Sequence, residues 1–315
     1  RISELSAELE AEKKARELAE NKAKIAEDNQ AQLRTSVNVL SNSVQRGAVE
    51  HIAKEYDYTS NAKIITVFGV GSHGVTTTAV SLAEKLRLQF RVLLIDFDLI
   101  SPKMHAFLPD ISPLLNGIKG FDNHDKTCTS MRAALKNGAE WFETEYNDCI
   151  ITASKATRNS SCIDYMSGFI GYTADDELEA FDFCSILNTV GEEYDRIIID
   201  FGKIGRSIVS DNIFKSVSKV ANKNVLVIHK NVYDMTNAKM RLENLDLSVT
   251  DTIWVLNMIE QTSLSKAHQS VIRTSDYVFI PIDDRIFEKN VSFTQSKHVK
   301  SNFENLIEKI RKESR

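Results

Sequence analysis

The stretch KIITVFGVGSHGVTTTAVSLA, residues 63–83, constrains the fold more than any other part of the sequence. An apolar strand, expected at Ile64–Phe68, leads into a glycine-bearing loop and then into a helix that opens with three threonines. A phosphate-binding loop requires this order, because backbone N–H groups converge on an anion and the helix N-terminus adds about half a positive charge. Such a loop usually ends in Gly-Lys-Thr, whereas this one ends in Gly74-Val75-Thr76. The sequence therefore predicts a phosphate loop without its lysine.

Composition and charge narrow the class of protein. The 315 residues suffice for one large α/β domain with an appendage or for two small domains. The net charge of −5 argues against a nucleic-acid partner that binds over the whole surface, although residues 285–315 carry eight Lys or Arg against four Glu. The sequence has no apolar run of about 18 residues, the length that a membrane-spanning helix needs.

The cysteines give no sign of a disulfide framework or a metal site. They stand far apart, without a C-x-x-C pair or a neighbouring histidine doublet, at Cys128, Cys149, Cys162 and Cys184. Their spacing predicts free thiols in a reducing cytoplasm and does not support a structural zinc site. We therefore expect a cytoplasmic protein, with membrane association through partners as the alternative.

Residues 1–55 are predicted to form a long helix ahead of the globular domain. They contain no aromatic residue and no proline, and they are rich in the strong helix formers Ala, Glu, Lys and Leu. A heptad frame from Ile2 places many apolar residues at a and d positions, but also Glu12, Arg16 and Gln30. A coiled coil with itself or with a protein partner and a solitary solvated helix both stay open. With a short linker, the domains are expected at 1–58 and 59–315.

The rest of the chain alternates apolar strands with helical patterns. Strands that are apolar on both faces are typical of parallel sheets covered by helices, so we predict a doubly wound, mostly parallel α/β sheet with ligands at the carboxyl ends of its strands. The further expected strands are RVLLIDFDLISP from Arg91, Arg196–Asp200, Asn224–Ile228, Thr252–Asn257 and Tyr277–Ile280. The expected helices include Thr76–Phe90, Asp175–Val190 and Ser301–Arg315. In the middle section we expect helices near Pro113–Ile118 and Thr129–Glu143 and strands at Cys149–Thr152 and Tyr165–Phe169.

Five blocks occur in a characteristic order: VFGVGSHGVTTTAVSLA, VLLIDFDLISPKMHAFL, YDRIIIDFG, WVLN and FIPID. With them, the domain from about residue 63 to 286 resembles the MinD/ParA group of P-loop ATPases, which have a deviant Walker A motif. The group includes the capsule-type bacterial tyrosine kinases and the TadZ/CpaE pilus-assembly proteins. The resemblance implies a P-loop NTPase-like fold, a homodimer, and ATP or ADP with Mg²⁺ as ligands.

The resemblance also implies which residues contact the nucleotide. Thr77 would contact the α-phosphate and Asn257 would read the adenine, while Pro281 would border the base and ribose. The full set of implied nucleotide-binding positions is Gly71, Ser72, His73, Gly74, Val75, Thr76, Thr77, Asn257, Pro281 and Asp283.

A magnesium site and catalytic carboxylates are implied in the same way. Thr76 would give its hydroxyl to Mg²⁺, with Asp98 and Asp200 as the other metal-binding residues. Asp96 and Asp98 fall where the group has its switch I carboxylates, and Asp200 matches the Walker B aspartate. In an active enzyme, Asp96, Asp98 and Asp200 would be the catalytic residues.

The departures from the group concern its charges. The group's loop reads K-G-G-x-G-K-T, and this chain reads VGSHGVT over residues 70–76. Val75 replaces the lysine that neutralises the β- and γ-phosphates, and Val70 replaces the signature lysine that reaches across a dimer. The D-x-P motif of switch II has become Asp200-Phe201-Gly202.

These losses predict weak or absent hydrolysis. Losing a charge-assisted hydrogen bond to phosphate costs about 1.5–3 kcal/mol of binding, and losing a transition-state donor costs about 10²–10³ in rate. Phosphoryl transfer depends almost entirely on electrostatic positioning. Lys103, Lys203 and Arg206 are candidates for a substitute cation, and a site without any bound nucleotide is the alternative.

Two features allow two interpretations each. His73 either supplies partial positive charge near phosphate or is a loop residue that faces solvent. The stripe Phe303, Leu306, Ile307 and Ile310, flanked by basic residues, is either a peripheral membrane contact at 301–315, as in MinD proteins, or packs against the sheet. The absence of tyrosine from 285–315 argues against the kinases, which end in a tyrosine cluster.

Two functions follow as hypotheses. In the first, the protein is a barely catalytic, dimerising scaffold or localisation factor that serves a bacterial machine such as a pilus or secretion system, with residues 1–55 as its partner arm. In the second, it is an active ATP-dependent switch between monomer and dimer.

Overall fold

A computed structural model of the chain describes residues 58–71, 73–98, 104, 150, 163–166, 180–206, 208–259, 263–272, 276–283, 293, 296–297 and 299–312. All of them belong to one compact unit, Tyr56–Arg315. The predicted helix at 1–55 and the predicted helices at 113–118 and 129–143 lie outside the described residues, as does Ser72. These expectations stay predictions.

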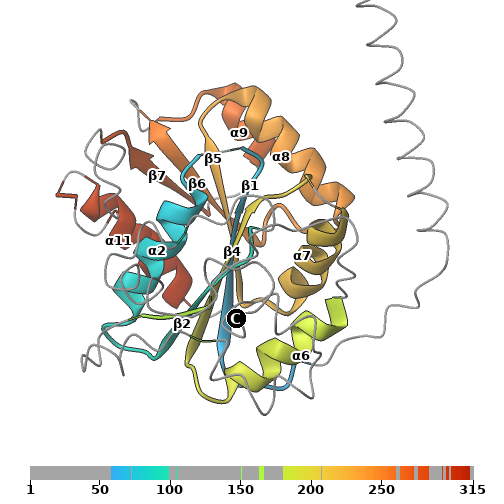
Figure 1. Cartoon of the computed structure of the whole chain (residues 1–315). Helices are drawn as coiled ribbons and strands as arrows, with labels where there is room; N and C mark the ends of the chain where they lie inside the picture. Colours follow the sequence, from blue (N-terminus) through green and yellow to red (C-terminus); the bar gives the residue numbers. More distant parts are fainter. Residues whose placement is uncertain are drawn as a thin grey trace, which may run out of the picture. The chain divides into compact units, whose positions relative to one another are not determined.

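The described part of the chain contains one seven-stranded sheet in which every pair of neighbouring strands is parallel (Figure 1). The strand order is β3-β2-β4-β1-β5-β6-β7. The strands are β1 Lys63–Gly69, β2 Val92–Asp96, β3 Asp164–Met166, β4 Arg196–Lys203, β5 Lys223–His229, β6 Thr252–Ile259 and β7 Tyr277–Pro281. The predicted parallel α/β sheet is confirmed.

The helices cover both faces of this sheet. In Figure 1, α2 and α11 lie on one face and α7, α8 and α9 lie on the other. The described helices are α2 Val75–Leu86, α6 Ala180–Gly191, α7 Ile208–Val220, α8 Val232–Asn244, α9 Lys266–Ile272 and α11 Lys300–Arg311. Each side therefore buries its own apolar core.

The alternation of side chains along the strands explains the two cores. Ile197 and Ile199 of β4 pack with α6, α7 and α8, whereas Ile198 between them packs with α2 and α11. All three side chains are fully buried. Because both faces are covered, apolar residues occupy successive positions, and this produced the continuous apolar runs in the sequence.

The bounds of several expected elements differ from the structure; helix α2, for example, ends at Leu86 where Phe90 was expected. The strand expected at Tyr165–Phe169 begins one residue earlier and its described part ends at Met166. Strand β4 runs three residues beyond Asp200, to Lys203. Within this extension Gly202 takes a left-handed conformation with φ 59°, and the register against β1 shifts. The extension brings Lys203 opposite Gly69 of β1.

The C-terminal helix uses its apolar stripe for packing. Phe303, Leu306, Ile307 and Ile310 are all buried in the core that α11 shares with α2 and the sheet. The Phe303 ring lies 5.7 Å from that of Phe293. These four side chains are therefore not available for the expected membrane contact through 301–315, which stays a prediction. No helix among the described residues is long and apolar enough to cross a membrane.

This packing predicts that Phe303→Ala lowers the free energy of unfolding by about 3–5 kcal/mol, because it removes a fully buried ring and leaves a cavity. Chemical denaturation measures the loss. Asn305→Ala, at an exposed position of the same helix, is the matched control and should change stability by less than about 0.5 kcal/mol. Equal stability of the two variants would contradict the packing.

Candidate functional site

The loop between β1 and α2 ends in a helix N-terminus that no side chain caps. Gly74 occupies the N-cap position with φ 88° and ψ 32°, and the first turn of α2 holds no acidic residue. A Cβ at Gly74 would lie 2.4 Å from Nδ2 of Asn257, so this position needs glycine both for its conformation and for its space. The first N–H groups of a helix have no partner within the helix, and here they face the loop. The arrangement suits an anion.

The two valines that stand where the MinD/ParA group has lysines are part of the core. Val70 and Val75 are each 6% exposed. Val75 packs with α11 and the sheet, whereas Val70 belongs to the core on the other face. A Cβ at Gly69 would lie 2.8 Å from both Val75 Cγ2 and the Val227 carbonyl oxygen, so the base of the loop is tightly packed.

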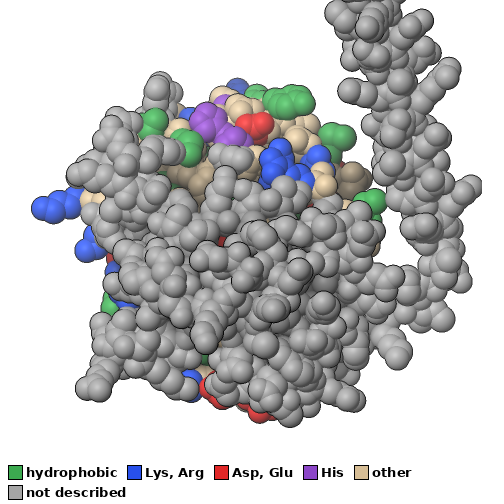
Figure 2. All heavy atoms as spheres, viewed as in Figure 1, with side chains coloured by type: hydrophobic (Ala, Val, Ile, Leu, Met, Phe, Trp, Pro, Cys, Tyr) green, Lys and Arg blue, Asp and Glu red, His purple; other side chains and the backbone are tan. Residues whose placement is uncertain are grey.

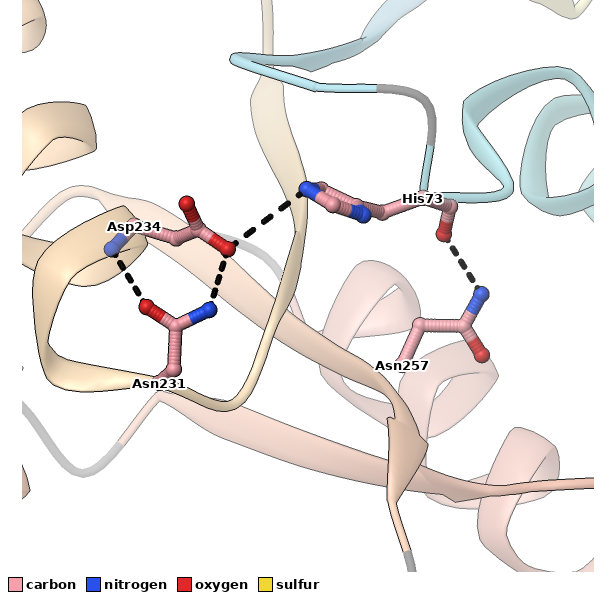
Figure 3. Close-up of polar contacts among 4 residues, drawn as sticks. All are labelled: His73, Asn231, Asp234 and Asn257. Atoms are coloured by element: carbon pink, nitrogen blue, oxygen red, sulfur yellow. Dashed lines mark hydrogen bonds and ion pairs between the residues drawn. The ribbon is translucent and has the colours of Figure 1, made fainter. Parts of the chain in front are cut away.

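His73 turns its ring toward α8 (Figure 3). Its Nε2 lies 3.7 Å from Oδ2 of Asp234, and its side chain is 23% exposed. The ring also lies 5.8 Å from that of His229 and close above Gly71. Burial lowers the pKa of His73, and the Asp234 carboxylate opposes this by raising the same pKa. His73 is therefore a partly buried residue, mostly neutral at neutral pH, whose ring contacts Asp234.

Asp234 is itself fixed by the start of α8. The backbone N–H of Asp234 donates to Asn231 Oδ1 at 2.7 Å, and the Asn231 amide donates back to the Asp234 carboxylate (Figure 3). Asn231 is the N-cap of the helix. Sequence analysis missed this pair, although Asn three residues before Asp at a helix start is a recognisable capping signal.

Asn257 holds the phosphate loop in place. Its Nδ2 donates to the carbonyl oxygen of His73 at 2.6 Å, and its Oδ1 accepts from the N–H of Met258 at 2.9 Å (Figure 3). The side chain is 3% exposed. In this arrangement one amide N–H is committed to the loop, and contact with an adenine stays a prediction.

Two carboxylates lie side by side under the loop. Asp96 and Asp200 are paired residues of the neighbouring strands β2 and β4, and they are 1% and 0% exposed. Asp96 accepts hydrogen bonds from the N–H groups of Met104 at 3.1 Å and Asp98 at 3.3 Å. Burial raises the pKa of Asp96 well above its usual value, and the Asp200 charge raises it further.

One carboxylate oxygen of Asp200 makes no hydrogen bond among the described residues. Its Oδ1 accepts from the N–H of Gly202 at 2.8 Å, whereas its Oδ2 is buried and makes no hydrogen bond among the described residues. Burial raises the pKa of Asp200 to about 7, opposed by Thr76 and by the Gly202 N–H. Thr76 is thus near this carboxyl without completing a hydrogen bond to Oδ2.

Asp98 completes the acidic group. A Cβ at Gly202 would lie 2.3 Å from Asp98 Oδ2, so the carboxylate rests directly on the backbone after Asp200. Its charge raises the pKa of both Asp96 and Asp200. The three predicted catalytic carboxylates and the metal-binding Thr76 therefore meet at one edge of the sheet.

The donor set fits Mg²⁺ only as part of a shared site. Among the described residues, no three His, Cys, Asp or Glu side chains are arranged to hold a metal by themselves. Mg²⁺ is commonly held by one or two carboxylates together with waters and phosphate oxygens. The unpaired Asp200 Oδ2, beside Thr76 and the loop, matches that mode of binding.

The remaining predicted positions have contacts within the protein. Asp283 is 8% exposed, and its carboxylate accepts a hydrogen bond from the Ser296 hydroxyl. Pro281 ends β7 opposite Ile259, and Thr77 is buried in the first turns of α2 with its carbonyl bound to Ser81. Their contacts with a nucleotide stay predictions.

No protein-family model and no curated protein sequence matches the chain. Solved structures do. A ParA family ATPase from Chlorobium tepidum TLS is 15% identical with a TM-score of 0.59, covering 78% of this chain and 98% of that one. The chain has the ParA/MinD fold.

Two other structures of the ParA/MinD fold contain nucleotides. MinD from Pyrococcus horikoshii OT3, complexed with Mg-ADP, is 19% identical with a TM-score of 0.57, covering 80% of this chain and 96% of that one. A putative plasmid partition protein from Borrelia burgdorferi B31, bound to AMPPNP, is 18% identical with a TM-score of 0.55, covering 78% and 97%. The resemblance inferred from the five sequence blocks is confirmed for the fold, whereas function has to be argued from the site.

The raised pKa of Asp200 predicts a pH-dependent gain from Asp200→Asn in the metal-free protein. Between about pH 4 and pH 7 the folded state keeps a proton that the unfolded state releases, so the wild type loses stability as pH rises. Asn keeps the acceptor for Gly202 without the charge, and should raise the free energy of unfolding by about 1–4 kcal/mol at pH 8.

Urea denaturation at several pH values measures this effect. The gain should shrink as pH falls and almost vanish below about pH 3, where Asp is protonated in both states. Asp251→Asn, at an exposed position, is the control. A variant that is less stable than the wild type at pH 8 would show that the charged form of Asp200 is favoured.

Proposed function

We propose that this protein binds ATP or ADP with Mg²⁺ at the loop and serves as a dimerising scaffold or localisation factor for a bacterial machine, with weak or absent hydrolysis. The observation that carries the nucleotide site is the buried, unpaired Asp200 Oδ2 next to Thr76 and the uncapped N-terminus of α2. Two proteins of the same fold contain Mg-ADP and AMPPNP. These facts support binding.

Different groups of the site would bind the phosphates and the metal ion. Backbone N–H groups from Gly71 to Thr76 would bind the phosphates at the helix N-terminus. The Thr76 hydroxyl, with Asp98 and Asp200, would hold Mg²⁺, which supplies positive charge to the phosphate oxygens when bound. The positive charge of Mg²⁺ would favour the ionised form of Asp200 and so lower its pKa. This would oppose the effect of burial, which raises the same pKa.

The same geometry argues against fast hydrolysis. Both positions that carry lysine in the group hold buried valines, and the neutral His73 ring is turned toward Asp234. Phosphoryl transfer relies on preorganised positive charge, which the described loop residues do not provide. Tight binding with slow turnover suits a protein whose nucleotide stabilises an assembly, as in a TadZ/CpaE-like factor.

The partner assignments are part of the proposal. A homodimer is expected from the ParA/MinD fold, and a protein partner would bind residues 1–55. The alternative, an active switch ATPase, would need a cation that the loop itself lacks.

Thermal unfolding with and without nucleotide tests the binding. Mg-ATP at about 100 times its dissociation constant should add about 2.7 kcal/mol to the stability of the wild type. Thr76→Ala should lose the part of this gain that requires Mg²⁺, whereas Thr236→Ala, at an exposed position of α8, should keep it.

Phosphate release, measured on the same samples, separates the two functions. The scaffold proposal expects almost no turnover in the wild type. Stabilisation accompanied by rapid turnover would favour the switch instead. No stabilisation at millimolar Mg-ATP would contradict nucleotide binding altogether.

A further inference from the structure

Lys203 lies at the entrance of the phosphate loop. It is the last residue of β4 and pairs with Gly69, the last residue of β1 before the loop. The next residue fixes this junction, because the N–H of Ile204 donates to the Gly69 carbonyl at 2.9 Å. The backbone at Lys203 is therefore held against the base of the loop.

Lys203 is also an electrostatic neighbour of His73 in the loop. Its positive charge helps to lower the pKa of His73, although burial of the ring, the opposing Asp234 charge and His229 have larger effects. Figure 2 shows basic side chains beside the histidine and acidic ones on this part of the surface. Of the substitute cations that the sequence suggested, Lys103 lies outside the described residues and Arg206 is exposed on the following turn.

Lys203 has no carboxylate partner within the described part of the chain. The ion pairs there join other lysines and arginines, such as Lys85 to Glu304 and Lys215 to Asp246. Three carboxylates at the same edge of the sheet, together with the phosphates of a nucleotide, would leave the site strongly negative. A lysine without a partner is suited to offset that charge.

The conformation of Gly202 explains why Lys203 comes to this place. Gly202 has φ 59°, whereas proline is restricted to a φ near −65°, so the proline of the group's D-x-P motif could not take this conformation. The register between β1 and β4 shifts at the same point. The glycine that replaces the proline of this motif therefore stands directly before the lysine that pairs with the base of the loop.

We propose that Lys203 binds the nucleotide phosphates in place of the two lysines that the loop lacks. This inference rests on the proposed nucleotide binding and deepens it. Lys203 would supply the positive charge that a loop with valine at positions 70 and 75 needs in order to bind a polyphosphate. It also predicts that the phosphates, and not the nucleoside, depend on this residue.

Isothermal titration calorimetry of four proteins, each containing all 315 residues, tests the inference with Mg-ATP, Mg-ADP, pyrophosphate and adenosine as ligands. The proteins are the wild type, Lys203→Met, Lys203→Arg and Lys63→Met. Lys63 is exposed at the amino end of β1, away from the strand ends that carry the site, so its variant removes the same charge elsewhere. Circular dichroism checks that each variant is folded.

Lys203→Met should weaken Mg-ATP, Mg-ADP and pyrophosphate at least about tenfold and leave adenosine unchanged, because only the phosphate contact is lost. Lys203→Arg and Lys63→Met should bind as the wild type does.

Two results would overturn the inference, and they are distinct. If the wild type binds Mg-ATP and Lys203→Met binds it equally well, the proposed nucleotide site stands and Lys203 is not its cation. If the wild type binds neither nucleotide nor pyrophosphate, the proposed function fails and the inference fails with it. An equal loss in Lys63→Met would reduce the effect to overall charge and contradict a local contact.

Discussion

The close backbone contact at Gly69 is the constraint on which the rest of the site depends. At this residue β1 meets the Val227 carbonyl of β5, the Val75 side chain of α2 and, through the Ile204 N–H, the end of β4. Any side chain would force at least one of these elements away. Because all of them converge on one residue, the loop, the helix N-terminus and the strand-end carboxylates are held in a fixed relation.

At this edge of the sheet the chain keeps the acidic residues of the MinD/ParA group but lacks the lysines of its loop. The acidic side is intact, with Asp96, Asp98 and Asp200 together and two of them with raised pKa values. The loop lacks the two lysines of the group, and the valines in their place, Val70 and Val75, are buried in the two cores. Lys203, at the end of β4, is a described cation that acts on the loop residue His73. A ligand that brings Mg²⁺ as well as phosphate would balance the carboxylates, and the proposed metal-bound nucleotide meets this requirement better than a free anion does.

The sequence predicted what depends on local patterns and missed what depends on contacts between distant segments. The parallel strands and the helix after the loop follow from apolar runs and helical spacing, and these predictions are confirmed. For the apolar stripe of α11 the sequence left packing and membrane contact open, and in the structure the stripe packs. The contact of His73 with Asp234 spans far-apart segments, and the bond from Asn257 to the loop joins residues 184 positions apart, so neither was predictable from spacing. The left-handed turn at Gly202 was visible only as a departure from a motif, without its consequence for Lys203.

A crystal structure of the protein grown with Mn²⁺ and ADP would test the central claim most directly, since Mn²⁺ replaces Mg²⁺ at oxygen sites and is located by its anomalous scattering. The account predicts the diphosphate over the backbone N–H groups from Gly74 to Thr76, with the metal bound by the Thr76 hydroxyl and facing Asp200. An ordered crystal with an empty loop, or with the nucleotide bound elsewhere, would contradict it.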